Sequence, residues 1–520
     1  MEDSTTVKPL ERGEETLGKV AKGAGIVLAG TVLGMLLNFL TKAVLARYYE
    51  RSQYGSFTLT VTVLSIAMTI ALLGLQNGLS REIARHLQRD RNVALKLAST
   101  GVLIGSSSSL ALTVLVFTLA PNLGNVLNDP HLNLVLRIAS PALLPMVLTM
   151  IIVAISRGHG RVRENFYYRN VLPQLLFLIL LLIVLILNLS FNWVFIAYVA
   201  AWTIPAFLGF RDGRKFGLLP RRPEFDWDLA KELLAFSFPL MLTGILDYVL
   251  GWTDSLMLGY YFGPDKVGLY NGAAPIARAL PVVLNSLGFV FMPMATVLFT
   301  GRDLKGLKRL YQSTTKWGFI LTFPAFLLLF AFPGGTINLF FGPKYTEAVT
   351  ALRILSLGFM FHVVMGLNAM SLVAVGRTSD NLIGNLLAAV LNIALNAALI
   401  PVYGINGAAL ATASSYIAAN LYRVSVLYRT TGVQPFGKAY TKALIIGAVT
   451  LVFGVFLGDS GSIPGAILKT AALYGGYFLL VLLSGCIEKE EAKNLEKFAE
   501  KVGLNLEWLI RIIERLSKDE

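Results

Sequence analysis

Long apolar stretches alternate with short polar connections along almost the whole chain. A helix needs about 20 residues to cross the ~30 Å hydrocarbon core of a bilayer, and each stretch meets that length. Fourteen spans are predicted, near residues 24–47, 54–80, 98–120, 134–156, 169–188, 191–210, 234–262, 267–299, 315–332, 350–375, 379–400, 405–428, 439–457 and 464–484. The pattern therefore predicts an all-α polytopic membrane protein.

Positive charge collects on alternate connections between these spans. The connections placed inside hold Arg81, Arg85, Arg89, Arg91, Lys96, Arg157, Arg161, Arg163, Arg211, Arg214, Lys215, Arg221, Arg222, Arg302, Lys305, Lys308, Arg309, Arg377, Arg429 and Lys438. Those placed outside hold Arg51, Lys266, Lys344 and little else. Because cytoplasmic loops carry an excess of lysine and arginine, the alternation predicts a cell-membrane protein with both termini in the cytoplasm.

Two short segments recur at a nearly constant distance. The segment Leu45 to Phe57 returns 213 positions later as Leu258 to Tyr270. Leu136 to Ser140 returns 216 positions later as Leu352 to Ser356. Each repeat contains six predicted spans, an even number, so both copies have the same orientation in the membrane. We therefore predict about 14 transmembrane helices in two parallel six-helix lobes plus two extra helices.

The same pattern divides the chain into six parts. They are a cytoplasmic N-terminus (1–23), an N-lobe with spans 1 to 6 (24–210), a cytoplasmic linker (211–233), a C-lobe with spans 7 to 12 (234–428), spans 13 and 14 (439–484), and a cytoplasmic amphipathic tail (485–520). Apolar residues recur at helical spacing in the tail, which suits packing on the cytoplasmic loops or contact with the membrane surface.

Composition narrows the class of protein further. Hydrophobic residues make up 55% of the 520 positions and charged residues 15%, which is typical of a chain dissolved in lipid. The net charge of +14 is explained by the inner connections, so no nucleic-acid partner is expected. The single cysteine, Cys486, rules out an intrachain disulfide. Neither a phosphate-binding Gly-x-x-x-x-Gly-Lys-Ser/Thr loop nor a Cys/His metal pattern occurs.

Ionisable residues inside the predicted spans are the first functional candidates. Lys42, Asp247, Asp254, Arg278 and His362 lie away from span ends, where each charge costs roughly 2.5 to 3.5 kcal/mol. Most should therefore face a cavity or each other. Asp247 and Asp254 are seven residues apart and share a helical face. They are predicted to share a wet cavity or to form salt bridges with Arg278 and Lys42, while His362 is read as a packed histidine.

Three arginines suit an anionic ligand. Arg278 is predicted near mid-membrane, where its planar guanidinium would bind phosphate or carboxylate oxygens in pairs. Arg137 and Arg353 occupy equivalent positions in the two repeats, at the outer ends of spans 4 and 10. The two arginines are predicted either to form a cationic outer opening of the transport path or to extend their side chains to the membrane–water interface.

The sequence contains no convincing catalytic motif. Gly458–Gly461 resembles a serine-protease signature but fills a tiny loop with no histidine nearby, so it is read as a turn. The predicted outer loops are too short for the catalytic domain of a membrane glycosyltransferase. A transporter is therefore predicted, not an enzyme, with a non-transporting scaffold as a further alternative.

Several motifs resemble the polysaccharide flippases of the multidrug/oligosaccharidyl-lipid/polysaccharide exporter superfamily, relatives of the O-antigen and lipid II flippases. The resemblance covers nearly the whole chain. It is carried by Asp254–Tyr261, Val267–Asn271, Gly376–Arg377 and above all Ile400–Ala409. In the last motif, Pro401 and Gly404 should stop one helix and turn the chain, and the small residues after them should let the next helix pack closely.

The resemblance implies a V-shaped pair of lobes that passes a polyprenyl-(di)phosphate-linked oligosaccharide outward by alternating access. Lys42, Arg47 and Arg278 would contact the phosphate, and spans 13 and 14 would guide the lipid tail. The arginine expected in the middle of span 2 is missing, so the resemblance does not extend to the lipid II headgroup. Membrane lipids and glycan-assembly enzymes are the other implied partners.

Some members of this family bind sodium between spans 7, 11 and 12. Asp254, Asn392, Asn396 and Thr412 fall at similar positions, with Asn396 where relatives can carry a second carboxylate. Sodium or proton coupling and plain amide hydrogen bonding between helices are both compatible with this set. No other cofactor is expected. A cation-coupled multidrug exporter of the same superfamily is the alternative function, and membrane potential is a second driving force for an anionic lipid.

Overall fold

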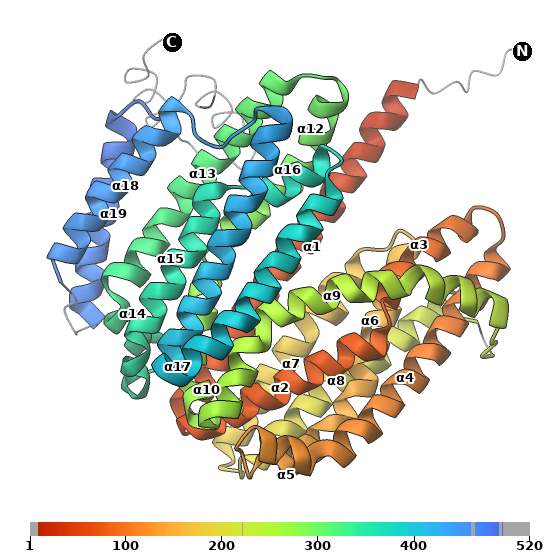
Figure 1. Cartoon of the computed structure of the whole chain (residues 1–520). Coiled ribbons are helices and arrows are strands. Elements are labelled where there is room, and N and C mark those ends of the chain that lie inside the picture. Colours follow the sequence, from red (N-terminus) through yellow and green to blue (C-terminus); the bar gives the residue numbers. More distant parts are fainter. Residues whose placement is uncertain (1–8, 221, 459–462, 488–490, 492–520) are drawn as a thin grey trace, which may run out of the picture. The chain divides into compact units, whose positions relative to one another are not determined.

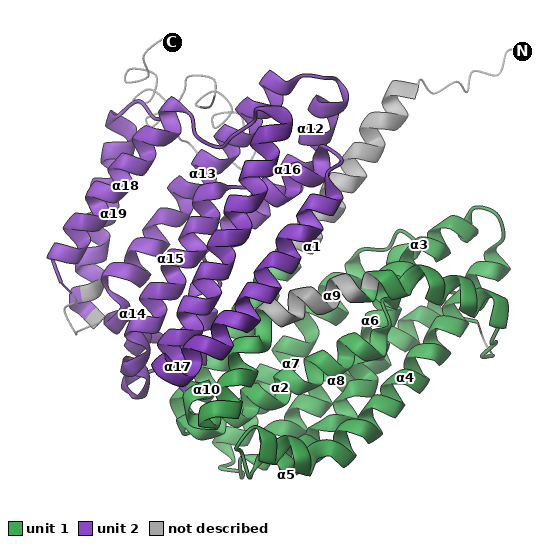
Figure 2. Cartoon of the chain, viewed as in Figure 1, with its two compact units in different colours: residues 1–268 green, residues 269–520 purple. Residues whose placement is uncertain are grey.

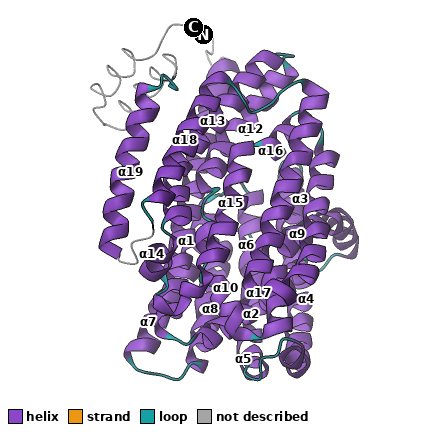
Figure 3. Ribbon diagram, turned by 60° about the vertical axis from the view of Figure 1, so that its left-hand side comes forward, coloured by secondary structure: helices purple, strands orange, loops and turns teal. Residues whose placement is uncertain are grey.

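The computed structural model of the chain describes residues 9–220, 222–458, 463–487 and 491 (Figure 1). The regular elements in these ranges are all helices (Figure 3). The prediction of an all-α polytopic membrane protein is confirmed, because eleven of the described helices are long and apolar enough to cross a membrane. The predicted total of fourteen spans stays a prediction.

The chain forms two compact units, Met1–Gly268 and Leu269–Glu520 (Figure 2). The boundary falls after helix α9 (Trp227–Phe262), which packs against α2, α3 and α4 of the first unit. The domain ranges predicted from the sequence stay predictions. The tail at 492–520 lies outside the described residues.

The first unit, called unit 1 below, contains α1 to α9 and most of α10. Its elements are α1 (Pro9–Tyr48), α2 (Arg51–Leu72), α3 (Leu75–Leu87), α4 (Arg91–Val126), α5 (Leu132–Ala139), a 3₁₀ turn (Ser140–Ala142), α6 (Leu143–Gly158), a π-helical segment (Asn165–Val171), α7 (Leu172–Ile186), α8 (Asn192–Lys215), α9 and α10 (Pro264–Asn271). Helix α6 is the centre of this unit, since α3, α4 and α8 all pack on it and most of its side chains are buried.

The second unit, unit 2, contains α11 (Ala274–Ala277), α12 (Val282–Thr300), α13 (Leu304–Ala331), α14 (Pro333–Phe340), a 3₁₀ segment (Pro343–Ala348), α15 (Val349–Met365), α16 (Asn368–Ala374), α17 (Thr378–Thr431), α18 (Lys438–Phe456) and α19 (Ile463–Leu483). Its core lies where α15 packs on α17 and α13. Helix α18 packs on α13 and α19 on α18.

Four predicted spans are divided into shorter helices. Span 134–156 divides into α5, a 3₁₀ turn and α6. Span 54–80 divides between α2 and α3 at Leu73 and Gly74, whose φ angles are 48° and 76°. Span 267–299 divides into α10, α11 and α12, and span 350–375 breaks at Gly366, with φ 66°. Hydropathy runs unbroken through Leu73 and Gly366, so it gave no sign of those two breaks. At both Leu73 and Gly366 a positive φ angle ends the preceding helix.

The turn predicted at Ile400–Ala409 is present. Gly404 has φ 54° and ψ −129°, which interrupts α17 and folds it into a helical hairpin. A Cβ atom on Gly407 would lie 2.2 Å from the Leu399 carbonyl oxygen, so only glycine permits this approach. The predicted turn therefore falls at Gly404, with a small residue at the close contact, while Pro401 stays within the helical part of α17 and does not end it.

The two copies of the repeated segment Leu45–Phe57 and Leu258–Tyr270 meet within unit 1. Gly55 on α2 and Gly268 on α10 occupy equivalent positions in the repeat and lie against each other. A Cβ on Gly55 would lie 1.8 Å from the Pro264 carbonyl oxygen, and one on Gly268 would lie 2.0 Å from that of Arg51. Arg51 also forms a 3.1 Å ion pair with Asp265 beside this glycine contact.

Candidate functional site

Lys42 lies on the membrane-spanning part of α1 and is half-buried. Its ammonium group is 5.9 Å from the centre of the Trp252 ring on α9. A cation over the face of an aromatic ring is an attractive arrangement that is strengthened away from water. The contact holds a positive charge and a broad aromatic face side by side within unit 1.

Asp254 lies two residues beyond Trp252 on the same helix and is completely buried. Its neighbour Ser255 is buried as well. The side chain of Asp247 lies outside the described residues, so its predicted cavity and salt bridge stay predictions. Burial of Asp254 agrees with the expectation that intramembrane acids face the protein interior.

The predicted phosphate contacts occupy different settings. Arg278 follows α11 in unit 2, at the break before α12, and is half-buried. It precedes the apolar helix Val282–Thr300 and does not lie within a continuous span. Arg47 lies in the last turn of α1 and is exposed. Lys42 and Arg47 thus belong to unit 1 and Arg278 to unit 2.

The equivalent arginines of the two repeats have different local partners. Arg137 on α5 lies 5.2 Å from the centre of the Phe117 ring and is exposed. Arg353 on α15 is half-buried and donates from Nε to the Phe330 carbonyl oxygen at 3.0 Å. Each arginine is therefore held within its own unit, and the predicted outer opening stays a prediction.

The residues predicted to bind a cation in the second half are brought together by the α17 hairpin. Asn392 donates from Nδ2 to Thr412 Oγ1 at 3.1 Å, and Asn396 donates from Nδ2 to Asn392 Oδ1 at 3.1 Å. All three side chains are buried. Their oxygens are suitable ligands for a hard cation. The bond between Asn392 and Thr412 also joins the two arms of the hairpin, whereas Asn392 and Asn396 lie on the same arm.

The Gly376–Arg377 motif forms the turn at the start of α17. Gly376 has φ 77°, and Arg377 donates from Nε to Asp380 Oδ2 at 2.5 Å. The hydrogen bond that Arg377 donates to the Asp380 carboxylate raises the pKa of the exposed guanidinium. This arginine, which lies between two predicted spans, is paired and structural.

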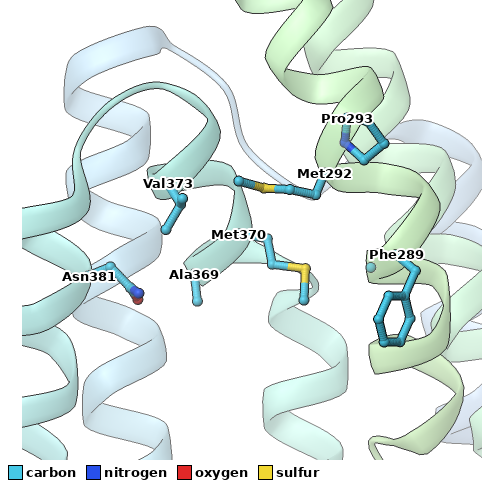
Figure 4. A pocket seen from close by; sticks show the side chains of 8 residues that line it. Phe289, Met292, Pro293, Ala369, Met370, Val373 and Asn381 are labelled. Carbon is cyan, nitrogen blue, oxygen red and sulfur yellow. The ribbon is translucent and has the colours of Figure 1, made fainter. Parts of the chain in front are cut away.

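An apolar cavity of about 490 Å³ lies in unit 2 between α12, α16 and α17 (Figure 4). Phe289, Met292 and Met370 supply most of the large side chains in its wall, and Asn381 points toward it. No charged residue is among those lining it. The cavity suits hydrocarbon and not a phosphate.

One buried ion pair was not predicted. Lys316 on α13 lies 2.6 Å from a carboxylate oxygen of Glu491, and its side chain is 3% exposed. Glu491 also accepts from Ser313 Oγ and Trp317 Nε1. Lys316 is the second residue of the predicted span 315–332, and no pattern in the sequence indicated its partner. A lysine buried so near a span requires an acidic partner, which Glu491 supplies.

Comparison with known proteins agrees with this architecture. The sequence profile of the family described as "Polysaccharide biosynthesis protein" matches residues 20–299, and that of the MatE family matches residues 239–398. In solved structures, the fold is similar to "Lipid II flippase MurJ, inward closed conformation", with TM-score 0.70 and 16% identity over 87% of this chain and 97% of that one.

Two relatives illustrate the range of similarity. "Uncharacterized membrane protein MJ1068" of Methanocaldococcus jannaschii is 28% identical over 45% of this chain, and the match spans about half, 46%, of that protein. "Probable low-salt glycan biosynthesis flippase Agl15" of Haloferax volcanii is 22% identical over 92% of this chain and 98% of its own length.

Apolar helices and flippase relatives define a multi-pass membrane protein of the flippase and transporter class. The chain belongs to the polysaccharide biosynthesis protein family, whose profile matches more than half of it. The resemblance inferred from Asp254–Tyr261 and Ile400–Ala409 is thereby confirmed.

Proposed function

We propose that the protein is a flippase that moves a polyprenyl-(di)phosphate-linked oligosaccharide from the cytoplasmic to the outer leaflet of the cell membrane by alternating access. The observation that carries the proposal is the contact between Lys42 and Trp252 within a membrane-embedded unit. The ammonium group suits a phosphate, and the neighbouring indole face suits a sugar ring. A lipid-linked glycan presents these two groups next to each other.

Arg278 and Arg47 are the further proposed phosphate contacts, with Arg137 and Arg353 near the outer end of the path. The relative Agl15 supports a glycan cargo because its name describes a glycan biosynthesis flippase. Glycan-assembly enzymes would supply the substrate on the cytoplasmic side, where both termini are proposed to lie. Membrane lipids are the surrounding partners.

Two driving forces are compatible with this proposal. Moving two negative charges outward through an inside-negative potential releases about 4 to 5 kcal/mol per 100 mV. A sodium or proton gradient is the other, with Asp254, Asp247, Asn392, Asn396 and Thr412 as the proposed cation-binding groups. The hydrogen-bonded cluster of Asn392, Asn396 and Thr412 supports coupling to a cation gradient.

A cation-coupled multidrug exporter is the second candidate function. The match of residues 239–398 to the MatE family favours it, and so does the apolar cavity of unit 2. Such an exporter would expel cationic dyes from loaded vesicles in a sodium- or proton-dependent manner. Dye export without any movement of lipid-linked glycan would replace the first proposal with this one.

The test measures flipping of a fluorescent polyprenyl-diphosphate oligosaccharide in proteoliposomes that contain the full chain. We expect Arg278→Gln and Lys42→Gln each to lower the rate by roughly tenfold, because each removes a charge-assisted hydrogen bond to phosphate. Arg214→Gln, an exposed arginine at the end of α8, is the matched control and should flip normally. Equal rates in all four proteins would remove the proposed phosphate contacts.

A further inference from the structure

A small polar cavity lies inside unit 1, apart from the residues discussed above. Its volume is about 200 Å³, below the roughly 300 to 1,000 Å³ of pockets that hold drug-sized ligands. Arg157 and Arg169 line it together with Gln76 and Asn77, and apolar side chains of α6 complete the wall. It fits a small charged group and not a sugar chain.

Close packing of α3 on α6 holds Arg157 in place. A Cβ on Gly158 would lie 2.9 Å from the Ser80 carbonyl oxygen, so glycine lets the two helices approach at this level. Arg157 then donates from Nη2 to the Gln76 carbonyl oxygen at 2.6 Å and from Nε to Ser80 Oγ at 3.2 Å. Among the described residues, its Nη1 group donates to no partner.

Arg169 comes from a different element, the π-helical segment Asn165–Val171. Such segments are rare and are often found at functional sites. Arg169 is exposed, and within the described chain no ion pair or hydrogen bond of its side chain is formed. Packing between α3 and α6 explains Arg157, but it does not explain a second arginine on the same small cavity.

The carboxylates on α3, on α8 and just before the π-helical segment form ion pairs or hydrogen bonds with other residues. Glu82 on α3 pairs with Arg81 at 2.9 Å, and Glu164 pairs with Arg161 at 2.6 Å. Asp212 on α8 accepts from the Tyr168 hydroxyl at 2.5 Å. Two guanidinium groups therefore share one cavity whose described lining contains no acid, and two like charges beside one cavity favour an anion between them.

We propose that this cavity, formed by Arg157 and Arg169, is a binding site for a phosphate group. The guanidinium fork matches phosphate oxygens, and the amide groups of Gln76 and Asn77 supply further donors. By the predicted topology the cavity faces the cytoplasm, since α6 ends at the inner connection. The phosphate belongs either to an anionic lipid headgroup or to a soluble phosphate compound.

The experiment uses the purified full chain in nanodiscs of phosphatidylcholine, titrated with inorganic pyrophosphate by calorimetry. Arg169→Gln is the main variant because that side chain supports no described packing contact. It should raise the pyrophosphate Kd by roughly tenfold, and Arg169→Lys by less, since lysine keeps the charge and loses the fork. Arg163→Gln removes an exposed arginine of the preceding turn that does not line the cavity, and it should bind like the parent protein.

A second arm identifies the source of the phosphate. Phosphatidic acid is added to the nanodiscs, and its retention by the parent protein and by Arg169→Gln is measured by native mass spectrometry. Retention that pyrophosphate competes away assigns the site to a lipid headgroup. Pyrophosphate binding without lipid retention assigns it to a soluble phosphate. Both results support the site.

Three results overturn the proposal. They are the absence of saturable binding of either probe, equal binding by the parent and Arg169→Gln, and equal weakening by Arg169→Gln and Arg163→Gln, which would reflect general electrostatics. The proposal does not rest on the flippase function, because binding is measured without transport. A chain that binds pyrophosphate here but fails to flip a glycan would keep this site and lose the proposed function.

Discussion

At the scale of single residues, the buried pair of Lys316 and Glu491 explains how a charge is tolerated inside unit 2. The Lys316 ammonium group also donates to the Cys486 carbonyl oxygen at 2.9 Å, so two of its three protons are bonded to described groups. Four side chains, those of Ser313, Lys316, Trp317 and Glu491, therefore join α13 to the start of the tail. A pair of this kind is stabilising only while both partners are present.

We expect Lys316→Met to lower the free energy of unfolding by about 3 to 5 kcal/mol, because it leaves the Glu491 carboxylate buried without its cation. The double variant Lys316→Met with Glu491→Leu should recover much of that loss. Thermal melting of the purified protein in detergent measures both. Lys305→Met, at an exposed position of α13, is the control. A double variant as unstable as the single one would contradict this account.

The residues of the candidate site were predictable to different degrees. Lys42 and Asp254 stand out in the sequence because a charge amid apolar residues is costly in lipid, and the structure buries them partly and fully, respectively. Arg157 and Arg169 gave no such signal, since arginines near span ends are expected on topological grounds alone. Only the tertiary packing of α3, α6 and the π-helical segment brings their side chains to one cavity.

At the scale of elements, close contacts at glycine fix how helices pack. The contact between α2 and α10 leaves no room for a side chain on either partner, because the obstructing atoms belong to the backbone. A methyl group at either position must push the helices apart, which a rotamer change cannot avoid.

Gly55→Ala should therefore destabilise the protein by about 1 to 3 kcal/mol, the usual range for overpacking a well-filled site. Gly251→Ala on α9 is the matched control, because a Cβ there meets nothing within 4 Å. It should be neutral or slightly stabilising through its helix propensity. Melting temperatures of the two variants measured side by side give the comparison. A Gly55 variant as stable as its control would refute the tight contact.

The hydropathy pattern predicted where helices form. It predicted where they are interrupted only at residues that disfavour a helix. Pro401 and Gly404 interrupt an apolar run with residues that disfavour a helix interior, so the turn in α17, which falls at Gly404, was correctly predicted. Leu73 lies in a left-handed conformation that its side chain disfavours, and it is held there by tertiary packing of Gly74 against Ser237. No local pattern signals such a break.

At the scale of the whole molecule, family membership and flippase relatives indicate a flippase or transporter. The proposed anionic cargo would make its movement sensitive to voltage. An inside-negative potential favours export of the cargo and return of an empty cationic site. We expect outward flipping in proteoliposomes to accelerate several-fold at −100 mV, because part of the ~4 to 5 kcal/mol acts on the rate-limiting step.

Potassium diffusion potentials of either sign provide the measurement, with the fluorescent glycan lipid as substrate. Reversing the potential should slow export, and a sodium or proton gradient applied at zero potential separates the two driving forces. A rate that ignores voltage and follows the sodium gradient would favour coupling through the asparagine cluster instead.

The meeting of Gly55 and Gly268 has a consequence for the origin of the chain. Equivalent residues of two repeats touch each other there, which is the self-complementary contact of a two-fold symmetric dimer. A half-length ancestor carrying this glycine would have contacted a second copy of itself at the same point. Fusion of two such copies would need no new contact surface at this position, because the two glycines already fit against each other.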